Sequence, residues 1–235
     1  MHTIRSGRES SRMVANVEGL KEFNLIVTGV GGQGSILASH IVAEAAVKRG
    51  FRVRVGETFG AAQRGGKVHS HVRIGDEVYG PLCSSRSLDV LLGLEPNETL
   101  RLALKYANDE TLIITNTRPV PSMDANIGAD AYPDVSQLIE ALGKLSGWVV
   151  SFDATELAVK AGNERTMNVV LLGALASSGK LPFGTESLRE AVLGRVPPRT
   201  VKVNEMAFNL GCDQLLPHFF DGFTSSPKMF TLGEG

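Results

Sequence analysis

Six residues near the start of the chain form a glycine-rich turn that could bind an anion. The turn reads Gly-Val-Gly-Gly-Gln-Gly and occupies residues 29–34. An apolar run at 23–27 precedes it and predicts a buried strand, while 35–49 predict a helix. A glycine turn between strand and helix leaves backbone N–H groups free at the positive helix end, where phosphate or another anion binds. The alternative is that the glycines only permit tight packing of the strand against the helix.

A second glycine-containing motif, Gln-Arg-Gly-Gly, follows at residues 63–66. The guanidinium of Arg64 can hold a carboxylate or phosphate through two parallel hydrogen bonds. Gly65 and Gly66 allow backbone amides to approach a ligand closely. The alternative is a surface turn with a solvated arginine, which the neighbouring glycine turn disfavours.

Three basic side chains follow on one strand. His69, His71 and Arg73 alternate along it and therefore share one face. A metal site would need a third ligand, and no carboxylate or cysteine keeps suitable spacing nearby. Either the histidines pack and hydrogen-bond across the sheet, or this face recognises an anionic ligand or a partner subunit.

Two further patterns leave alternatives open. Glu57 lies near the end of the second predicted strand, where a dinucleotide-binding fold places the acid that holds a ribose. Asn163, Asn168 and Asn204 each lie near a helix start, so they either cap helices or contact a ligand. Capping is the simpler interpretation of the three asparagines.

The composition excludes several functional classes. The 235 residues are 43 % hydrophobic and carry a net charge of −1, so no global basic field recruits nucleic acid. Only two cysteines are present, which argues against a disulfide scaffold and against an iron–sulfur cluster held by this chain. No apolar run is long enough to cross a membrane, and no secretory segment follows the polar start, so we expect a cytoplasmic protein.

The order of elements predicts an α/β protein with a three-layer α/β/α architecture and a mostly parallel, mixed sheet. The first strand–helix–strand unit is Rossmann-like, and a hairpin of 68–74 with 78–80 interrupts the parallel pattern. We expect the strands at 23–27, 51–55, 68–74, 78–80, 88–94, 111–115 and 148–152. We expect the helices at 35–49, 96–106, 137–145, 155–161, 166–177, 185–193 and 200–215, with Asp153 capping the fourth.

The chain divides into three predicted parts. Residues 1–21 form an N-terminal extension, and 216–235 form a docking or loose tail. Residues 22–215 form the single domain, with an α/β core at 22–162 and a helical part at 163–215.

Taken together, the motifs at 29–34 and 63–66 and the sequence Ser-His-Val-Arg-Ile-Gly at 70–75 resemble one family. It is the gamma domain of the 2-oxoacid:ferredoxin oxidoreductases, and the likeness is greatest to the small subunit of the indolepyruvate enzymes. The resemblance covers about residues 22–215.

The resemblance implies an enzyme that oxidatively decarboxylates a 2-oxoacid with coenzyme A, giving an acyl-CoA, carbon dioxide and reduced ferredoxin. It implies that thiamine diphosphate, Mg²⁺ and [4Fe-4S] clusters lie on a larger partner subunit, and that this chain packs against that subunit and helps to bind coenzyme A. Ferredoxin would be reached through the complex, and this chain alone would be inactive. No nucleic acid and no membrane is expected as a partner.

The resemblance also assigns residues. Gly29, Gly31, Gly32 and Gly34 would supply backbone amides, while Gln63, Arg64, Gly65 and Gly66 would form a loop facing the partner's active site. With Gln33, these are the expected cofactor-binding residues; no catalytic or metal-ligating residue is expected on this chain. Two alternatives remain: a free-standing Rossmann-like oxidoreductase that uses NAD or a flavin, and an assembly module that kept the fold without the site.

Overall fold

A mixed β-sheet forms the centre of the molecule in the computed structural model, which describes residues 19–59, 66–120, 132–215 and 228–231. In this part of the chain the sheet has seven strands in the order β2-β3-β1-β4-β5-β6-β7. The strands are β1 Phe23–Val30, β2 Val53–Phe59, β3 Lys67–Ile74, β4 Val90–Gly93, β5 Leu112–Asn116, β6 Trp148–Phe152 and β7 Lys228–Thr231. Only β3 runs against the others, so the sheet is mixed and mostly parallel, as predicted.

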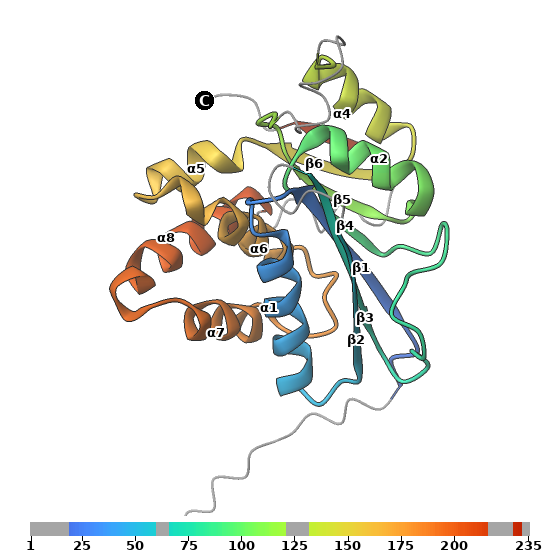
Figure 1. The fold of residues 1–235 in the computed structure, drawn as a ribbon, viewed down its shortest axis with the longest axis horizontal. Helices are drawn as coiled ribbons and strands as arrows, with labels where there is room; N and C mark the ends of the chain where they lie inside the picture. The colour runs from blue at the N-terminus through green and yellow to red at the C-terminus, as the bar shows by residue number, and fades with distance from the viewer. Residues whose placement is uncertain (1–18, 60–65, 121–131, 216–227, 232–235) are drawn as a thin grey trace, which may run out of the picture.

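Helices cover both faces of the sheet (Figure 1). On one face lie α2 and α4, and on the other lie α1 and the helices of the C-terminal part. The helices are α1 Ser35–Lys48, α2 Pro96–Tyr106, α4 Val135–Gly143, α5 Ala154–Lys160, α6 Met167–Ser177, α7 Thr185–Arg195 and α8 Val201–Cys212. The predicted three-layer α/β/α architecture with a helical C-terminal part is therefore confirmed.

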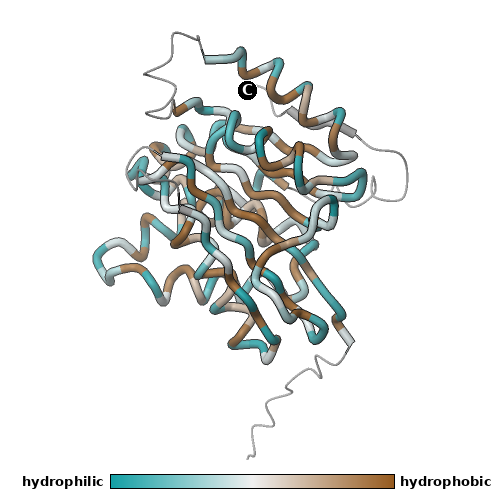
Figure 2. The backbone as a smooth tube through the Cα atoms, turned by 45° about the vertical axis from the view of Figure 1, so that its right-hand side comes forward, coloured by the Kyte–Doolittle hydropathy of each residue, from teal (hydrophilic) through white to brown (hydrophobic). Residues whose placement is uncertain are grey.

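The apolar core follows from the alternation of side chains along the strands. Leu25 and Val27 of β1 face α1, whereas Ile26 between them faces α2. All of β1 is buried, as expected for a central strand covered on both faces. Figure 2 shows hydrophobic residues concentrated along the strands, and helices along which hydrophilic and hydrophobic residues alternate.

The position of β3 corrects the predicted Rossmann-like unit. β1 and β2 run in the same direction but do not pair, because β3 lies between them and is antiparallel to both. The predicted hairpin partner at 78–80 is not a strand. Since β2 and β1 already occupy the two edges of β3, no edge is left for this short segment.

Helix α6 is buried on nearly all sides, and glycines let it approach α8. A Cβ at Gly173 of α6 would lie 2.0 Å from the Phe208 carbonyl oxygen, and one at Gly211 of α8 would lie 1.8 Å from the Val170 carbonyl oxygen. The backbones of the two helices are thus in direct contact at both glycines. This contact fixes the position of the first turn of α6, which lies at the site described below.

The ends of the chain lie largely outside the described residues. The N-terminal extension is described only from residue 19, and of the predicted tail only Lys228–Thr231 is described, where it pairs in parallel with β6. The division at 21, 162 and 215 therefore stays a prediction. Within the described ranges, no helix is long and apolar enough to cross a membrane.

Candidate functional site

The turn after β1 is shaped by the side chain of Gln33. Its Oε1 accepts a hydrogen bond of 2.7 Å from the Val30 N–H, and its Nε2 donates one of 3.1 Å to the Leu94 carbonyl. A Cβ at Gly29 would lie 2.7 Å from Gln33 Oε1, so Gly29 leaves the room that this side chain needs. The amide of Gln33 is therefore engaged with backbone groups and gives the turn its shape.

The two glycine motifs meet at one place. β1 and β3 pair up to Val30 opposite Lys67, and just beyond this pair the Gly31 N–H donates 2.8 Å to the Gly66 carbonyl. The two motifs were predicted to lie close together, and this is confirmed for Gly66, the described residue of the second motif. Gly31 uses its N–H in this bond, so that group is not free for a ligand. Gln63, Arg64 and Gly65 lie outside the described residues.

Helix α1 begins at this junction. Gly32 and Gly34 have φ of +106° and +85°, a left-handed conformation that favours glycine. Gly34 is the N-cap, no side chain among the described residues caps the helix, and its first turn contains no acid. The first backbone N–H groups of this 14-residue helix thus lie at its positive end without a capping side chain from the described residues, a condition for anion binding.

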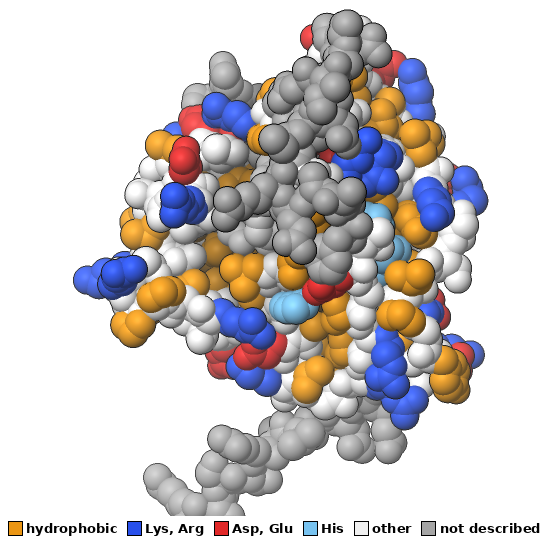
Figure 3. Space-filling view, viewed as in Figure 1, with side chains coloured by type: hydrophobic (Ala, Val, Ile, Leu, Met, Phe, Trp, Pro, Cys, Tyr) orange, Lys and Arg blue, Asp and Glu red, His pale blue; other side chains and the backbone are white. Residues whose placement is uncertain are grey.

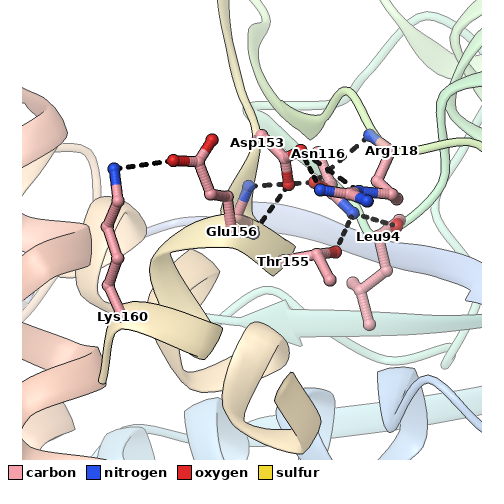
Figure 4. Close-up of polar contacts among 8 residues, drawn as sticks. Leu94, Asn116, Arg118, Asp153, Thr155, Glu156 and Lys160 are labelled. Atoms are coloured by element: carbon pink, nitrogen blue, oxygen red, sulfur yellow. Dashed lines mark hydrogen bonds and ion pairs between the residues drawn. The ribbon is translucent and has the colours of Figure 1, made fainter. Parts of the chain in front are cut away.

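A polar network at the carboxyl edge of the sheet supports the turn (Figure 4). The Leu94 carbonyl that accepts from Gln33 also accepts 3.3 Å from Nδ2 of Asn116, which donates as well to Thr155 Oγ1 at 3.1 Å. Asn116 Oδ1 accepts from the Ala154 N–H at 2.9 Å. The glycine turn is thereby tied to the end of β5 and the start of α5.

The same network includes an ion pair. Arg118 donates to Asp153 Oδ2 from Nε and Nη2 at 3.1 and 2.6 Å, while Asp153 Oδ1 caps α5 by accepting from Glu156 N–H at 2.8 Å. The predicted capping role of Asp153 is confirmed. Asn116 was not singled out from the sequence, although an asparagine directly after an apolar strand is the available signal.

A buried acid, Glu95, lies beside this edge at the end of β4. Its carboxylate caps α2 by accepting from the Glu98 N–H at 2.8 Å, and it accepts a hydrogen bond from the Tyr132 hydroxyl. Burial raises the pKa of Glu95. Because both carboxylate oxygens accept hydrogen bonds, Glu95 joins the start of α2 to Tyr132.

The row of His69, His71 and Arg73 packs within the protein. His71 is 1 % exposed, and its Nδ1 accepts from the Cys83 N–H at 3.2 Å. Arg73 is paired with Glu22 at 2.7 Å. Burial is the main cause that lowers the pKa of each histidine to about 4. The packing interpretation holds for His71 and Arg73, and no group of three metal-ligand residues occurs in the described part of the chain.

Glu57 does not occupy the place of a ribose-binding acid. Its Oε1 lies 2.5 Å from His40 Nε2 of α1. In a dinucleotide-binding fold the acid ends the strand next to the first strand, whereas here β3 separates β2 from β1. The sequence argument for NAD or flavin binding therefore loses its support.

The three asparagines have different roles. Asn163 caps the short 3₁₀ helix Glu164–Thr166 by accepting from the Arg165 N–H at 3.1 Å. Asn204 donates 2.8 Å to the Thr200 carbonyl near the start of α8. Asn168 neither caps a helix nor bonds to a carbonyl within the described residues, and its side chain lies against Gly34.

Basic and acidic side chains are interspersed on one face of the molecule. On the face seen in Figure 3, Lys and Arg side chains lie beside Asp and Glu side chains and do not gather in one basic field. Glu44, for example, pairs with both Lys48 and Arg195.

Comparisons with known proteins agree with this architecture. Residues 24–214 match the family described as pyruvate ferredoxin/flavodoxin oxidoreductase. The chain is 42 % identical to the indolepyruvate oxidoreductase subunit IorB of Pyrococcus horikoshii over 193 residues, covering 82 % of this chain and 95 % of that protein. The corresponding protein of Archaeoglobus fulgidus is 41 % identical over the same length and coverage.

Solved structures share the fold. The gamma subunit of a keto/oxoacid ferredoxin oxidoreductase from Geobacter sulfurreducens matches with a TM-score of 0.61 and 26 % identity, over 83 % of this chain and 98 % of that one. The 2-oxoglutarate:ferredoxin oxidoreductase of Magnetococcus marinus matches with a TM-score of 0.62 and 21 % identity, over 84 % of this chain and 31 % of that one. With the family match and the IorB identities, these findings place the chain in the pyruvate ferredoxin/flavodoxin oxidoreductase family.

Proposed function

We propose that this chain is the small subunit of an indolepyruvate-type 2-oxoacid ferredoxin oxidoreductase. The enzyme would oxidatively decarboxylate a 2-oxoacid with coenzyme A to an acyl-CoA, carbon dioxide and reduced ferredoxin. The identity of about two residues in five to the IorB subunits, over nearly their full length, supports this assignment. The cytoplasm remains the expected location.

The proposal divides the work between two subunits. Thiamine diphosphate, Mg²⁺ and [4Fe-4S] clusters would be held by the larger subunit, since two cysteines are too few for a four-cysteine cluster here. Thiamine diphosphate supplies the stabilised carbanion when it is bound to the partner. The residues of this chain would bind coenzyme A, orient it and exclude water.

The open start of α1 beside Gly66 is the observation that carries the coenzyme A role. The Gly31–Gly66 hydrogen bond brings both glycine motifs close to the start of this helix, which no described side chain caps. Phosphate oxygens are the groups that such a helix end binds. Gly32 and Gly34 would let the ligand approach, Gly29 and Gln33 would shape the turn, and Gln63, Arg64 and Gly65 would extend the site toward the partner. The 2-oxoglutarate enzyme of similar fold was solved with coenzyme A bound.

Co-expression with the larger subunit, followed by assays over several 2-oxoacids, tests the proposed function. We expect coenzyme A-dependent ferredoxin reduction by the complex and none by this chain alone. In that complex, Arg64→Ala should raise the apparent KM for coenzyme A or the 2-oxoacid by about tenfold, because a charge-assisted hydrogen bond to the ligand is lost. Unchanged kinetics would remove Arg64 from the site, and an isolated chain that binds NAD would favour the alternative function.

A further inference from the structure

Within the described part of the chain, one end of the sheet has no helix packed over it on the side of α2 and α4. On that side α2 packs on β1, β4 and β5 and α4 packs on β6, whereas β2 and β3 form the end of the sheet (Figure 1). Only the last residue of α2 reaches β3, where the ring of Tyr106 contacts that of His71. On the opposite side of the sheet, α1 covers the same two strands.

The segment 75–89, which joins β3 to β4, lies over this end of the sheet. Arg73 of β3 donates 2.9 Å to the Gly80 carbonyl, and Leu82 lies 3.0 Å from the position that a Cβ on Gly56 of β2 would take. Two large hydrophobic side chains of the segment nevertheless remain exposed, Tyr79 by 80 % and Leu82 by 55 %. Tyrosine is enriched where proteins bind one another.

Exposed basic side chains lie on the same side. Arg54 of β2 pairs with Arg73 in the strand register, and Lys67 of β3 alternates with the residues that face α1. Lys105 lies at the end of α2, where its carbonyl accepts 2.7 Å from the Ser85 hydroxyl of the segment. Arg54, Lys67 and Lys105 are exposed, and none of them forms an ion pair with another described residue. We call this surface, made of the segment 75–89 with Arg54, Lys67 and Lys105, the β2–β3 face.

The acids near the β2–β3 face leave these cations unbalanced. Glu22 is paired with Arg73 and Glu98 with Arg101, each at 2.7 Å. The exposed acids at 76–77 lie in the turn after β3, at the end of that strand away from Lys67. A surface that combines unbalanced cations with exposed hydrophobic side chains is complementary to one that is acidic and partly apolar.

We propose that the β2–β3 face is the surface through which this chain docks on the larger subunit, against an acidic and partly apolar surface of that subunit. The inference rests on the proposed function, which directs the connection between β2 and β3 toward the partner. β2 ends at Phe59 and β3 begins at Lys67, so the face continues directly from that connection. A second copy of this chain is a poorer occupant, because a symmetric contact would bring the same cations together.

Two matched double variants test this docking surface. Lys67→Glu with Tyr79→Asp reverses one cation of the face and replaces an exposed hydrophobic side chain with an acid. Lys202→Glu with Met206→Asp makes equivalent changes on α8, on the other side of the sheet, where Lys202 is exposed and Met206 is 52 % exposed. All four positions are on the surface, so both variants should fold, which thermal unfolding checks.

The measured quantity is the Kd between the full-length chain and the larger subunit, at low and at high salt. We expect the face variant to raise Kd by about 100-fold at low salt, because two new acids then meet an acidic surface. Lys105→Glu alone should raise it by about tenfold. High salt should weaken the wild-type complex and narrow these differences, since it screens the charges. The α8 variant should stay within about threefold of the wild type.

The possible failures are distinguishable. If the wild-type chain binds the larger subunit and the face variant binds as tightly, or the α8 variant weakens the complex as much, the docking surface is wrong and the proposed function stands. If the wild-type chain does not bind the larger subunit, the proposed function fails and the docking surface with it. Sedimentation of this chain alone tests the other occupant: a dimer that the face variant dissociates would assign the face to a second copy and overturn the inference.

Discussion

At the scale of single residues, Gln33 shows how one side chain can fix the backbone of a glycine-rich turn. Its amide accepts from the Val30 N–H and donates to the Leu94 carbonyl, which Asn116 also contacts. The glycine turn is therefore fixed by side-chain-to-backbone bonds before any ligand arrives. Pre-formed geometry of this kind lowers the entropic cost of binding.

The variant Gln33→Ala tests this role. It leaves the Val30 N–H without its acceptor, so we expect a loss of about 1–3 kcal/mol in the free energy of unfolding, together with weaker coenzyme A binding. Chemical denaturation measures the first effect. Gln137→Ala, at an exposed position of α4, is the control and should change stability by less than about 0.5 kcal/mol. Equal stability of the two variants would contradict the role of Gln33.

The sequence predicts the site only in part, and the reasons are physical. The glycine motifs could be found because glycine spacing between a strand and a helix has a local cause. The internal role of Gln33 could not, since it depends on Leu94, 61 residues away. Asn168 could be placed near a helix start, but that helix meets α1 only through tertiary packing.

At the scale of elements, the contact between α6 and α8 depends on two glycines. Any side chain at Gly173 or Gly211 would overlap the backbone of the facing helix, at 2.0 and 1.8 Å from its carbonyl oxygens. The two helices would have to separate, and α6 would move together with Asn168.

We expect Gly173→Ala and Gly211→Ala each to lower the free energy of unfolding by about 2–4 kcal/mol, because the backbones cannot shift independently. Gly194→Ala in α7 is the matched control, since a Cβ there meets nothing within 4 Å. This control should be neutral or stabilising by up to about 1 kcal/mol, as expected for alanine in a helix. Thermal unfolding compares the stability of the three variants. Equal stability of all three would contradict the role of Gly173 and Gly211 in the helix contact.

Individual elements were more predictable than their arrangement. The strand at 148–152 and the helix at 96–106 have the predicted bounds, because apolar runs and the proline at the helix start are local signals. The pairing of β3 with both β1 and β2 was missed. Its register with β1 joins residues 37 to 51 positions apart, and no pattern within β3 predicts which strands it will pair with.

At the scale of the whole molecule, global stability depends on keeping His71 neutral. Its Nδ1 accepts from the Cys83 N–H, and a proton there would break that bond. Its pKa is lowered from 6.5 to about 4 by burial and by His69, Lys105 and Arg73. Between these pH values the unfolded chain binds a proton that the folded chain does not, so stability falls as the pH falls.

The variant His71→Gln removes this proton while keeping an acceptor for Cys83. At pH 5 the wild type should have lost on the order of 2 kcal/mol more of its pH 7 stability than the variant. The comparison uses the difference between the proteins because burial raises the pKa of Asp89 and Glu95, which act in the opposite direction. Parallel curves of unfolding free energy against pH would contradict the prediction.

The ladder between β2 and β3 has a consequence for how this family can diversify. Seven residue pairs, from Val53 opposite Ile74 to Phe59 opposite Val68, hold the two strands in register. Insertions or deletions between residues 60 and 65 therefore change the length of the connection and leave the ladder unaltered. The number of residues in this connection can accordingly vary at little cost to folding, with Gly66, whose carbonyl accepts from the Gly31 N–H, as the residue at which each connection joins β3.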